Sequence, residues 1–220
     1  MKVLLSILAS FFNRRASLDI FLYLETAGHE YSLAFLDQER LSNPVTSVAK
    51  EVHWNLKWLL FMDLDGTMWD NLDVSSCKLP FKPVDRDRIV DSSGKVISLN
   101  PDSREFLKWA RDMGAIISTC TWNETAHVMG ALEAFGLKNA FDYFQITNDS
   151  RKDKIMKDLL DILHRKKVHI DHRNIFYLDD RDIHMDEIRH LIPEINFLYM
   201  GVHVKGFADA KKIISARLGF

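Results

Sequence analysis

The sequence predicts an α/β fold, a three-layer Rossmann-like parallel sheet with helices on both faces and a small β-hairpin flap after the first strand of the core. From Trp58 onward, short apolar runs alternate with helical patterns four or five times, which is typical of a mostly parallel sheet. The first run is continuously apolar, as expected for a strand buried on both faces. Three of the runs end in Asp or Thr, and parallel strands place their carboxyl ends at one edge, where such folds bind ligands.

The chain has 220 residues, with 29 Lys and Arg against 31 Asp and Glu, and its formal charge is −2. A hydrophobic content of 47% is typical of a folded globular protein. The near-neutral charge argues against broad affinity for nucleic acid, so we expect no nucleic-acid partner. Two cysteines, Cys77 and Cys120, are too few for a disulfide framework or a four-ligand zinc site, and we expect free thiols in a cytoplasmic protein.

Residues 1–57 are interpreted as an N-terminal extension of unknown role. The apolar run at 3–12 resembles the centre of a secretory signal, but no small-residue cleavage site follows it and it is too short to span a bilayer. We expect a helix or strand packed on the domain and no membrane partner, with an uncleaved membrane-contacting anchor as the minor alternative. Two further runs, Ile20–Leu24 and Tyr31–Leu36, fit a hairpin or two short helices, and residues 38–57 resemble a connector.

Residues 58–220 form the predicted core domain, and Trp58–Met62 is its first strand. An insertion at about 70–99 follows that strand and lacks a helical pattern. It contains a good hairpin signal, because two short apolar pairs, Ile89-Val90 and Val96-Ile97, flank a turn that ends in a glycine. We expect this hairpin to lie over the site as a flap.

The rest of the domain continues the alternation. Four further strands are predicted at Ala115–Cys120, Tyr143–Ile146, Ile175–Leu178 and Ile195–Met200. Helices are expected between them and after the last, with start or stop signals at Asn100-Pro101 and Gly114, at Asn123 and Gly136, at the capping-box pattern Ser150–Asp153, and from about Phe207 to Leu218. The helix after the capping box should turn Ile155, Leu159 and Ile162 inward.

The strongest functional signal is Asp63-Leu-Asp65-Gly66-Thr67, directly after the first strand. Two carboxylates two residues apart at the end of a buried strand repel each other unless a cation lies between them. A hard divalent ion such as Mg²⁺, which prefers oxygen ligands, would relieve that repulsion. Gly66 permits the unusual backbone angle that aims neighbouring groups at one point.

Polar residues end two other predicted strands. Thr121 closes the second strand, and the pair Asp179-Asp180 closes the strand at Ile175–Leu178. Because right-handed crossovers bring the carboxyl ends of parallel strands to one edge, we expect these side chains to lie close to Asp63.

From about Trp58 to the C-terminus the sequence resembles the haloacid dehalogenase superfamily of phosphohydrolases, most of all its magnesium-dependent phosphatase branch. The four motifs of that superfamily have matches in the correct order: DxDxT at Asp63–Thr67, a strand-closing Thr at Thr121, a Lys at a helix start at Lys152, and an acidic pair at Asp179-Asp180. Thr119 and Lys154 are the alternatives for the second and third motifs. Two features depart from the pattern, namely His184, where relatives often have Asn or Asp, and the extension 1–57.

The resemblance implies a role for each matched residue. Asp63 would be the nucleophile that forms an aspartyl-phosphate, and Asp65 the general acid and then base. Mg²⁺ would be held by Asp63, the main-chain carbonyl of Asp65, and Asp180. Thr121 would bind a phosphoryl oxygen, and Lys152 would pair with Asp179. Thr67 would have a supporting role.

We therefore expect a Mg²⁺-dependent phosphomonoester hydrolase that acts on a phosphorylated small molecule or a phosphoprotein, as a monomer or an oligomer. One alternative is a catalytically silent phosphate- or protein-binding module of the same fold, which loss of Asp63, Asp65 or Lys152 would indicate; the other is a phosphotransferase. Cys120 has no evident base partner, so a cysteine nucleophile is poorly supported. For His184, a role at the substrate and simple helix packing are both open.

Overall fold

The computed structural model describes residues 3–7, 20–26, 29–32 and 57–220. The chain divides into two units, Met1–His53 and Trp54–Phe220. In the first unit, three strands form an antiparallel sheet: β1 (Val3–Ile7), β2 (Ile20–Thr26) and β3 (His29–Ser32).

This small sheet decides between the two interpretations of the extension. β2 pairs antiparallel with β3, so the hairpin is confirmed and the pair of short helices is wrong for the described residues. The apolar run at 3–12 is a strand over Val3–Ile7, and its remaining residues lie outside the described ones. The same holds for the expected connector 38–57, of which only Lys57 is described.

The second unit is organised around a five-stranded parallel sheet, in the order β11-β10-β4-β8-β9. Its strands are β4 (Trp58–Met62), β8 (Ala115–Trp122), β9 (Tyr143–Thr147), β10 (Ile175–Asp179) and β11 (Asn196–Tyr199). The first strand of this unit, β4, lies at the centre of the sheet, and β8 and β9 follow on one side of it. The chain then crosses to the other side of β4, where it forms β10 and β11. The sheet order therefore reverses at β4, and folds of this kind bind ligands at such a switch point.

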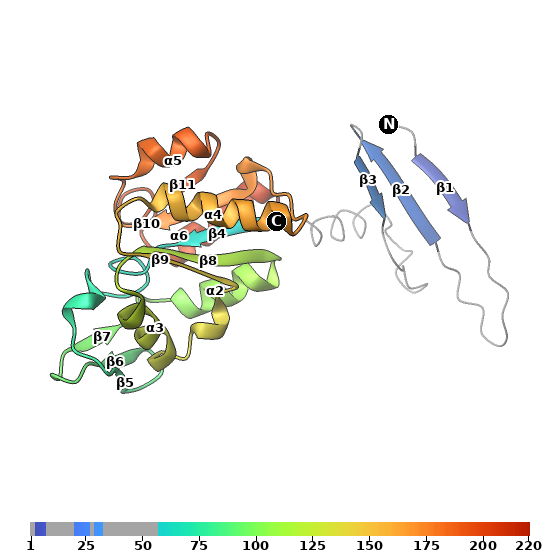
Figure 1. Ribbon diagram of the computed structural model, residues 1–220. Coiled ribbons are helices and arrows are strands. Elements are labelled where there is room, and N and C mark those ends of the chain that lie inside the picture. Colours follow the sequence, from blue (N-terminus) through green and yellow to red (C-terminus); the bar gives the residue numbers. More distant parts are fainter. Residues whose placement is uncertain (1–2, 8–19, 27–28, 33–56) are drawn as a thin grey trace, which may run out of the picture. The chain divides into compact units, whose positions relative to one another are not determined.

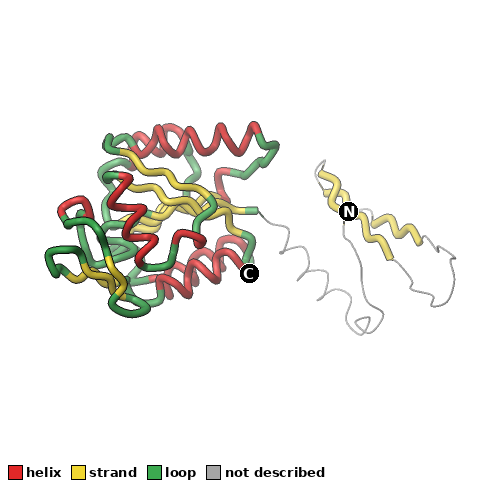
Figure 2. The backbone as a smooth tube through the Cα atoms, turned by 60° about the horizontal axis from the view of Figure 1, so that its bottom comes forward, coloured by secondary structure: helices red, strands yellow, loops and turns green. Residues whose placement is uncertain are grey.

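Helices cover both faces of the sheet, as the sequence predicts (Figures 1 and 2). One face carries α2 (Ser103–Asp112), α3 (Thr125–Ala134) and α6 (Phe207–Leu218), and the other carries α4 (Lys152–Arg165) and α5 (Met185–Leu191). Short 3₁₀ helices are η2 (Val74–Ser76), η3 (Lys138–Ala140) and η4 (His172–Asn174). None of the helices among the described residues is long and apolar enough to cross a membrane.

The central strand β4 is fully buried because its side chains alternate between two cores. Leu60 and Met62 belong to the core on the α2 face, and Leu59 and Phe61 to the core on the α4 face. Each such side chain contributes about 1.5–3 kcal/mol by leaving water. The loop that follows β4 is therefore held by a strand that is anchored on both sides.

The insertion after β4 forms a second antiparallel sheet of β5 (Lys82–Pro83), β6 (Arg88–Val90) and β7 (Val96–Ser98). The predicted hairpin is confirmed, since Val90 pairs with Val96. The insertion packs against α3, where a Cβ on Gly130 would lie 3.4 Å from Leu79 and from Phe81. Its segment around η2 borders the site.

Two predicted helix starts differ from the structure. α2 begins at Ser103 and not at Asn100-Pro101, because Asp102 adopts a left-handed conformation with φ of 63° and ends a turn. α3 begins at Thr125, and its N-cap is Glu124 rather than Asn123. Oδ1 of Asn123 still accepts a hydrogen bond from the N–H of Glu124 at 2.6 Å, but its Nδ2 group donates to Asp65 and Asp73.

The rotation of α4 also differs from the prediction. The inward residues are Met156, Leu159 and Leu163, whereas Ile155 and Ile162 are only half-buried. The expected capping box does not form, because the N-cap makes no side-chain hydrogen bond. The first residue of the helix, a fully buried lysine, lies on the same stripe as the three inward residues.

Candidate active site

Asp63 leaves β4 at the switch point of the sheet. Its N–H donates to the carbonyl of Leu178 at 2.9 Å, so pairing with β10 continues up to this residue. Asp179 and Asp180 end the neighbouring strand. One carboxylate oxygen of each of the three aspartates lies within 4.8 Å of the others. The structure thus brings together the first and fourth predicted motifs, and Asp63 and Asp179 are almost completely buried.

Lys152 lies between two of these carboxylates. Its Nζ is 2.6 Å from Asp63 Oδ1 and 2.6 Å from Asp179 Oδ2, and the side chain is fully buried. Burial lowers the pKa of Lys152, but the two carboxylates raise it above its ordinary value, so the ammonium stays charged. Lys154, by contrast, is exposed and lies 3.4 Å from Asp149. The geometry favours Lys152 over Lys154 for the third motif.

Asp179 has partners for both of its oxygens. Oδ2 accepts hydrogen bonds from Lys152 and from the hydroxyl of Tyr177, and Oδ1 accepts one from the N–H of Arg181 at 2.8 Å. Both oxygens of Asp179 are therefore hydrogen-bonded, one of them to Lys152. This is the pairing that the superfamily resemblance implies.

Each of the other two carboxylates has an oxygen without a hydrogen bond. Oδ2 of Asp63 and Oδ1 of Asp180 are buried, and neither has a hydrogen-bond partner within the described part of the chain, although Nε of Arg181 lies 3.9 Å from Asp180 Oδ1. Burial raises the pKa of Asp63 to about 8, against the effect of its lysine, and it also raises the pKa of Asp180. These two oxygens and the neighbouring carboxylate of Asp179 make an all-oxygen donor set, which fits a hard divalent cation.

Gly66 allows the loop after β4 to approach Asp180. Its φ is 73°, which side-chain-bearing residues rarely adopt, and a Cβ at this position would lie 2.9 Å from Cγ of Asp180. The residue next to it, Thr67, is fully buried, and its hydroxyl lacks a partner among residues 57–220. Gly66 thus has the role that the sequence predicts for it.

Thr121 and Thr119 can be distinguished by their hydroxyl groups. Oγ1 of Thr119 donates to the carbonyl of Gln145 at 3.3 Å. Oγ1 of Thr121 is buried and has no partner in the region that the structure describes, although it lies at the end of β8 beside the acidic cluster. Thr121 is therefore the better candidate to bind an oxygen of a ligand.

Asp65 is held by three donors. Its Oδ1 accepts hydrogen bonds from Nε1 of Trp69 at 2.7 Å and from the N–H of Val74 at 3.1 Å, and its Oδ2 accepts one from Nδ2 of Asn123. Burial raises the pKa of Asp65 although these donors oppose the shift. Asp65 also lines a cavity of about 420 Å³, together with residues that include Asp73. A buried carboxyl that faces a cavity and retains its proton more readily than usual can act as an acid.

Comparison with known proteins identifies the family. The family model described as Acid Phosphatase matches residues 55–212, which is well over half of the chain. The chain belongs to this family. It is thereby a haloacid dehalogenase superfamily phosphohydrolase, and the predicted superfamily is confirmed. No curated protein matches it significantly.

Two solved structures are similar to this phosphatase family member. An uncharacterized protein from Listeria monocytogenes serotype 4b is 13% identical with a TM-score of 0.52, and the match covers 74% of this chain and 99% of that one. The N-terminal part of BF1531 from Bacteroides fragilis, which contains a phosphatase domain complexed with Mg, is 18% identical with a TM-score of 0.49, over 79% and 43% of the two chains. At 13% identity, the similarity to the Listeria protein shows a shared fold and not a shared function.

The contact of Asn123 with Asp65 in the phosphatase domain is not predicted from the sequence. Asn is common at helix starts, so the pattern indicates a cap there. The signal for a site role is the position of Asn123 two residues beyond Thr121, at the same edge of the sheet. The partner on the other side, Asp73 at 3.1 Å, belongs to the insertion, whose path the sequence does not reveal.

Two residues with open roles can now be placed. The Nε2 atom of His184 is buried and lacks a partner among the described residues, and its ring stands edge-on to Trp122 with centroids 6.2 Å apart. Burial lowers the pKa of His184. Cys120 is fully buried in the core, and burial raises the pKa of its thiol far above the range in which a thiolate nucleophile forms.

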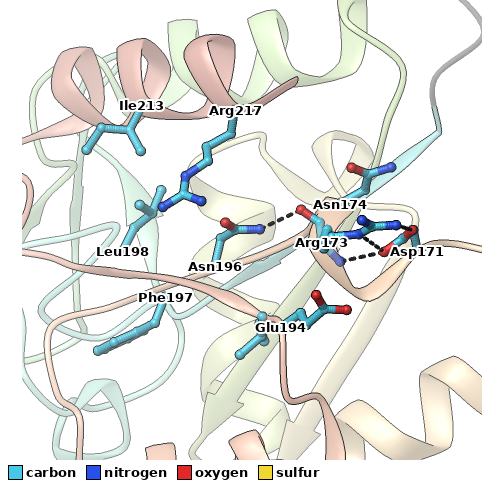
Figure 3. A pocket seen from close by; sticks show the side chains of 10 residues that line it. Asp171, Arg173, Asn174, Glu194, Asn196, Phe197, Leu198, Ile213 and Arg217 are labelled. Atoms are coloured by element: carbon cyan, nitrogen blue, oxygen red, sulfur yellow. Dashed lines mark hydrogen bonds and ion pairs between the residues drawn. The ribbon is translucent and has the colours of Figure 1, made fainter. Parts of the chain in front are cut away.

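A second cavity, of about 720 Å³, lies at the opposite edge of the sheet, where β10 and β11 begin (Figure 3). Arg173 on its wall is paired with Asp171 at 2.6 Å, and Asn196 donates to the main-chain carbonyl of Arg173 at 2.7 Å. None of the predicted site residues lines it. The chemistry that the sequence predicts is thus confined to the carboxyl edge.

Proposed function

We propose that this protein is a Mg²⁺-dependent phosphomonoester hydrolase that acts through an aspartyl-phosphate on Asp63. The observation that supports it most is the buried ion pair of Lys152 with Asp63 and Asp179, next to one oxygen each of Asp63 and Asp180 that accepts no hydrogen bond from the described residues. A buried polar atom without a hydrogen bond is costly, so these oxygens are suited to bind a cation.

Mg²⁺ would be held by Asp63, by Asp180 and by the main-chain carbonyl of Asp65. Asp179 is excluded from this set in our proposal because both of its oxygens are already hydrogen-bonded. The ion would neutralise charge on the phosphoryl oxygens, which is the main requirement of phosphoryl transfer.

In the first step, an oxygen of Asp63 forms a bond to phosphorus while the bond from phosphorus to the ester oxygen breaks. Asp65 gives its proton to that departing oxygen, and the raised pKa of Asp65 favours the protonated starting form. Lys152 and the hydroxyl of Thr121 stabilise the phosphoryl oxygens. Thr67, buried beside the nucleophile, supports the loop.

In the second step, the now ionised Asp65 takes a proton from water. The water oxygen attacks phosphorus, the bond to the Asp63 oxygen breaks, and inorganic phosphate leaves with the carboxylate restored. The substrate is proposed to be a phosphorylated small molecule or a phosphorylated protein side chain. The cavity beside Asp65, about 420 Å³, is within the usual size range of small-molecule sites.

A hydrolysis assay tests this function. Wild-type protein should cleave p-nitrophenyl phosphate with Mg²⁺ and lose this activity in EDTA, and Asp63→Asn should be inactive in both. Exposed Asp158 on α4 provides a matched control, since Asp158→Asn should retain full activity. Hydroxylamine should release phosphate from denatured wild-type enzyme quenched during turnover, and not from Asp63→Asn. Activity that survives in Asp63→Asn would exclude the proposed nucleophile.

We also propose a cytoplasmic location and no nucleic-acid or membrane partner. Both cysteines, Cys77 and Cys120, are buried free thiols, which suits a reducing compartment. Fractionation of cells that express the tagged full-length chain would test the location, and recovery with membranes would contradict it.

A further inference from the structure

Every polar atom of the Asn123 side chain is used. Its Nδ2 donates to Oδ2 of Asp65 and, at 3.1 Å, to Oδ1 of Asp73, while its Oδ1 accepts from the N–H of Glu124 at 2.6 Å. The side chain is 7% exposed. Both amide protons and the amide oxygen have partners, so exchanging the oxygen and nitrogen would break all three hydrogen bonds and the side chain has one favoured orientation.

The two oxygens of Asp65 are not equivalent. Oδ1 accepts two hydrogen bonds, from Trp69 and from the N–H of Val74, so both of its acceptor positions are occupied. Oδ2 accepts one hydrogen bond, from Asn123. The open acceptor position is therefore on Oδ2, and Asn123 is the side chain that holds this oxygen.

Asp73 connects this arrangement to the insertion. Its Oδ1 also accepts from the N–H of Ser75 at 3.0 Å and so caps η2. The N–H of Val74, in the same short helix, donates back to Asp65. Hydrogen bonds thus link Asp65, Asn123, Asp73 and η2 in a ring that returns to Asp65.

We infer that Asn123 is a positioning residue that directs Oδ2 of Asp65, the oxygen that carries the proton, toward the leaving-group oxygen. The inference rests on the proposed phosphatase function. A general acid acts only within hydrogen-bond reach of the atom it protonates, so a carboxyl group free to rotate would lose part of its effect.

The test compares two esters of similar size. Phenoxide is a more basic leaving group than p-nitrophenoxide and depends more on protonation. In Asn123→Ala, kcat/KM should fall about tenfold for phenyl phosphate and only about twofold for p-nitrophenyl phosphate, since general acids contribute up to 10²–10⁴-fold. Asn123→Ser, which keeps a hydroxyl donor, should show an intermediate loss.

Asn196→Ala is the matched control for folding. Asn196 is a half-buried asparagine at the opposite edge of the sheet, and its Nδ2 donates to the main-chain carbonyls of Arg173 at 2.7 Å and Ile175 at 3.1 Å. Its loss should affect both esters equally. If Asn123→Ala does not fold, the same comparison is made on Asn123→Ser against Asn196→Ala.

The variant Asp65→Asn shows whether Asn123 acts through Asp65. In that background, Asn123→Ala should cause no further loss that depends on the leaving group. An equal loss for both esters in Asn123→Ala, with Asp63→Asn inactive, would overturn the positioning role and leave the proposed function intact. If wild type cleaves neither ester, or Asp63→Asn cleaves both, the proposed function fails and this inference fails with it.

Discussion

Burial of the charged Lys152 side chain would be energetically unfavourable without its two carboxylate partners. Its fully buried ammonium group lies 2.6 Å from Asp63 and 2.6 Å from Asp179. Removing one member of such a buried ion pair leaves an uncompensated charge and costs about 3–5 kcal/mol. At the scale of single residues, then, the same side chain serves stability and the proposed chemistry.

We therefore predict that Lys152→Ala lowers the free energy of unfolding by about 3–5 kcal/mol and abolishes phosphatase activity. Urea unfolding and the p-nitrophenyl phosphate assay measure the two effects. Lys154→Ala is the control on the same helix, because Lys154 is exposed and should change stability by at most about 0.5 kcal/mol. A stable and active Lys152→Ala would show that the third motif lies elsewhere.

The pKa shift of Asp63 gives a second prediction. Burial raises its pKa from 3.8 to about 8 in the folded protein, so the folded state favours the protonated form. In EDTA, this contribution to stability is complete below pH 4 and is lost as pH rises to about 8. Mg²⁺ stabilises the ionised form, so its effect on Tm should be larger at pH 8 than at pH 5.

Thermal melting with Mg²⁺ and with EDTA at these two pH values measures the difference. In Asp63→Asn, the group can no longer ionise, and the pH dependence of the Mg²⁺ effect should shrink. An identical Mg²⁺ effect at both pH values in the wild type would contradict the assignment of Asp63 as a ligand.

At the scale of elements, the strands could be predicted more closely than the helix faces. β4 and α6 have the expected bounds, because continuous apolar runs and clear end signals mark them. α4 has the expected position but a different inward face. Sequence periodicity treats a lysine as an exposed residue, whereas Lys152 is buried and shares its stripe with Met156.

The rotation of α4 can be tested by a pair of substitutions at neighbouring positions. Met156 is fully buried and Ile155 half-buried. Met156→Ala should cost about 2–5 kcal/mol of unfolding free energy, because it leaves a cavity in the core on the α4 face. Ile155→Ala should cost clearly less, and the opposite order would favour the face that periodicity predicts.

At the scale of the whole molecule, the site follows from the order of the strands. The edge where Asp63, Thr121 and Asp179 meet could be predicted because any right-handed parallel sheet brings these strand ends together. The place of Asn123 beside Asp65 could not, because it depends on the path of the insertion between β4 and α2. Local propensity assigns an asparagine before a helix to a cap, and the competing contact arises only in three dimensions.

The division of the chain into Met1–His53 and Trp54–Phe220 leads to a prediction about the extension. Among residues 57–220, whose burial the structure describes, the two hydrophobic cores of the catalytic sheet begin at Trp58, and all the proposed site residues lie in the same range. A chain that begins at Trp54 should therefore fold cooperatively and keep kcat/KM for p-nitrophenyl phosphate within about twofold of the full-length protein, because independent units contribute separately to stability. Circular dichroism during urea unfolding and the hydrolysis assay measure both properties. An insoluble or inactive truncated chain would show that residues 1–53 contribute to the catalytic unit, and the extension would then have to be placed in its core.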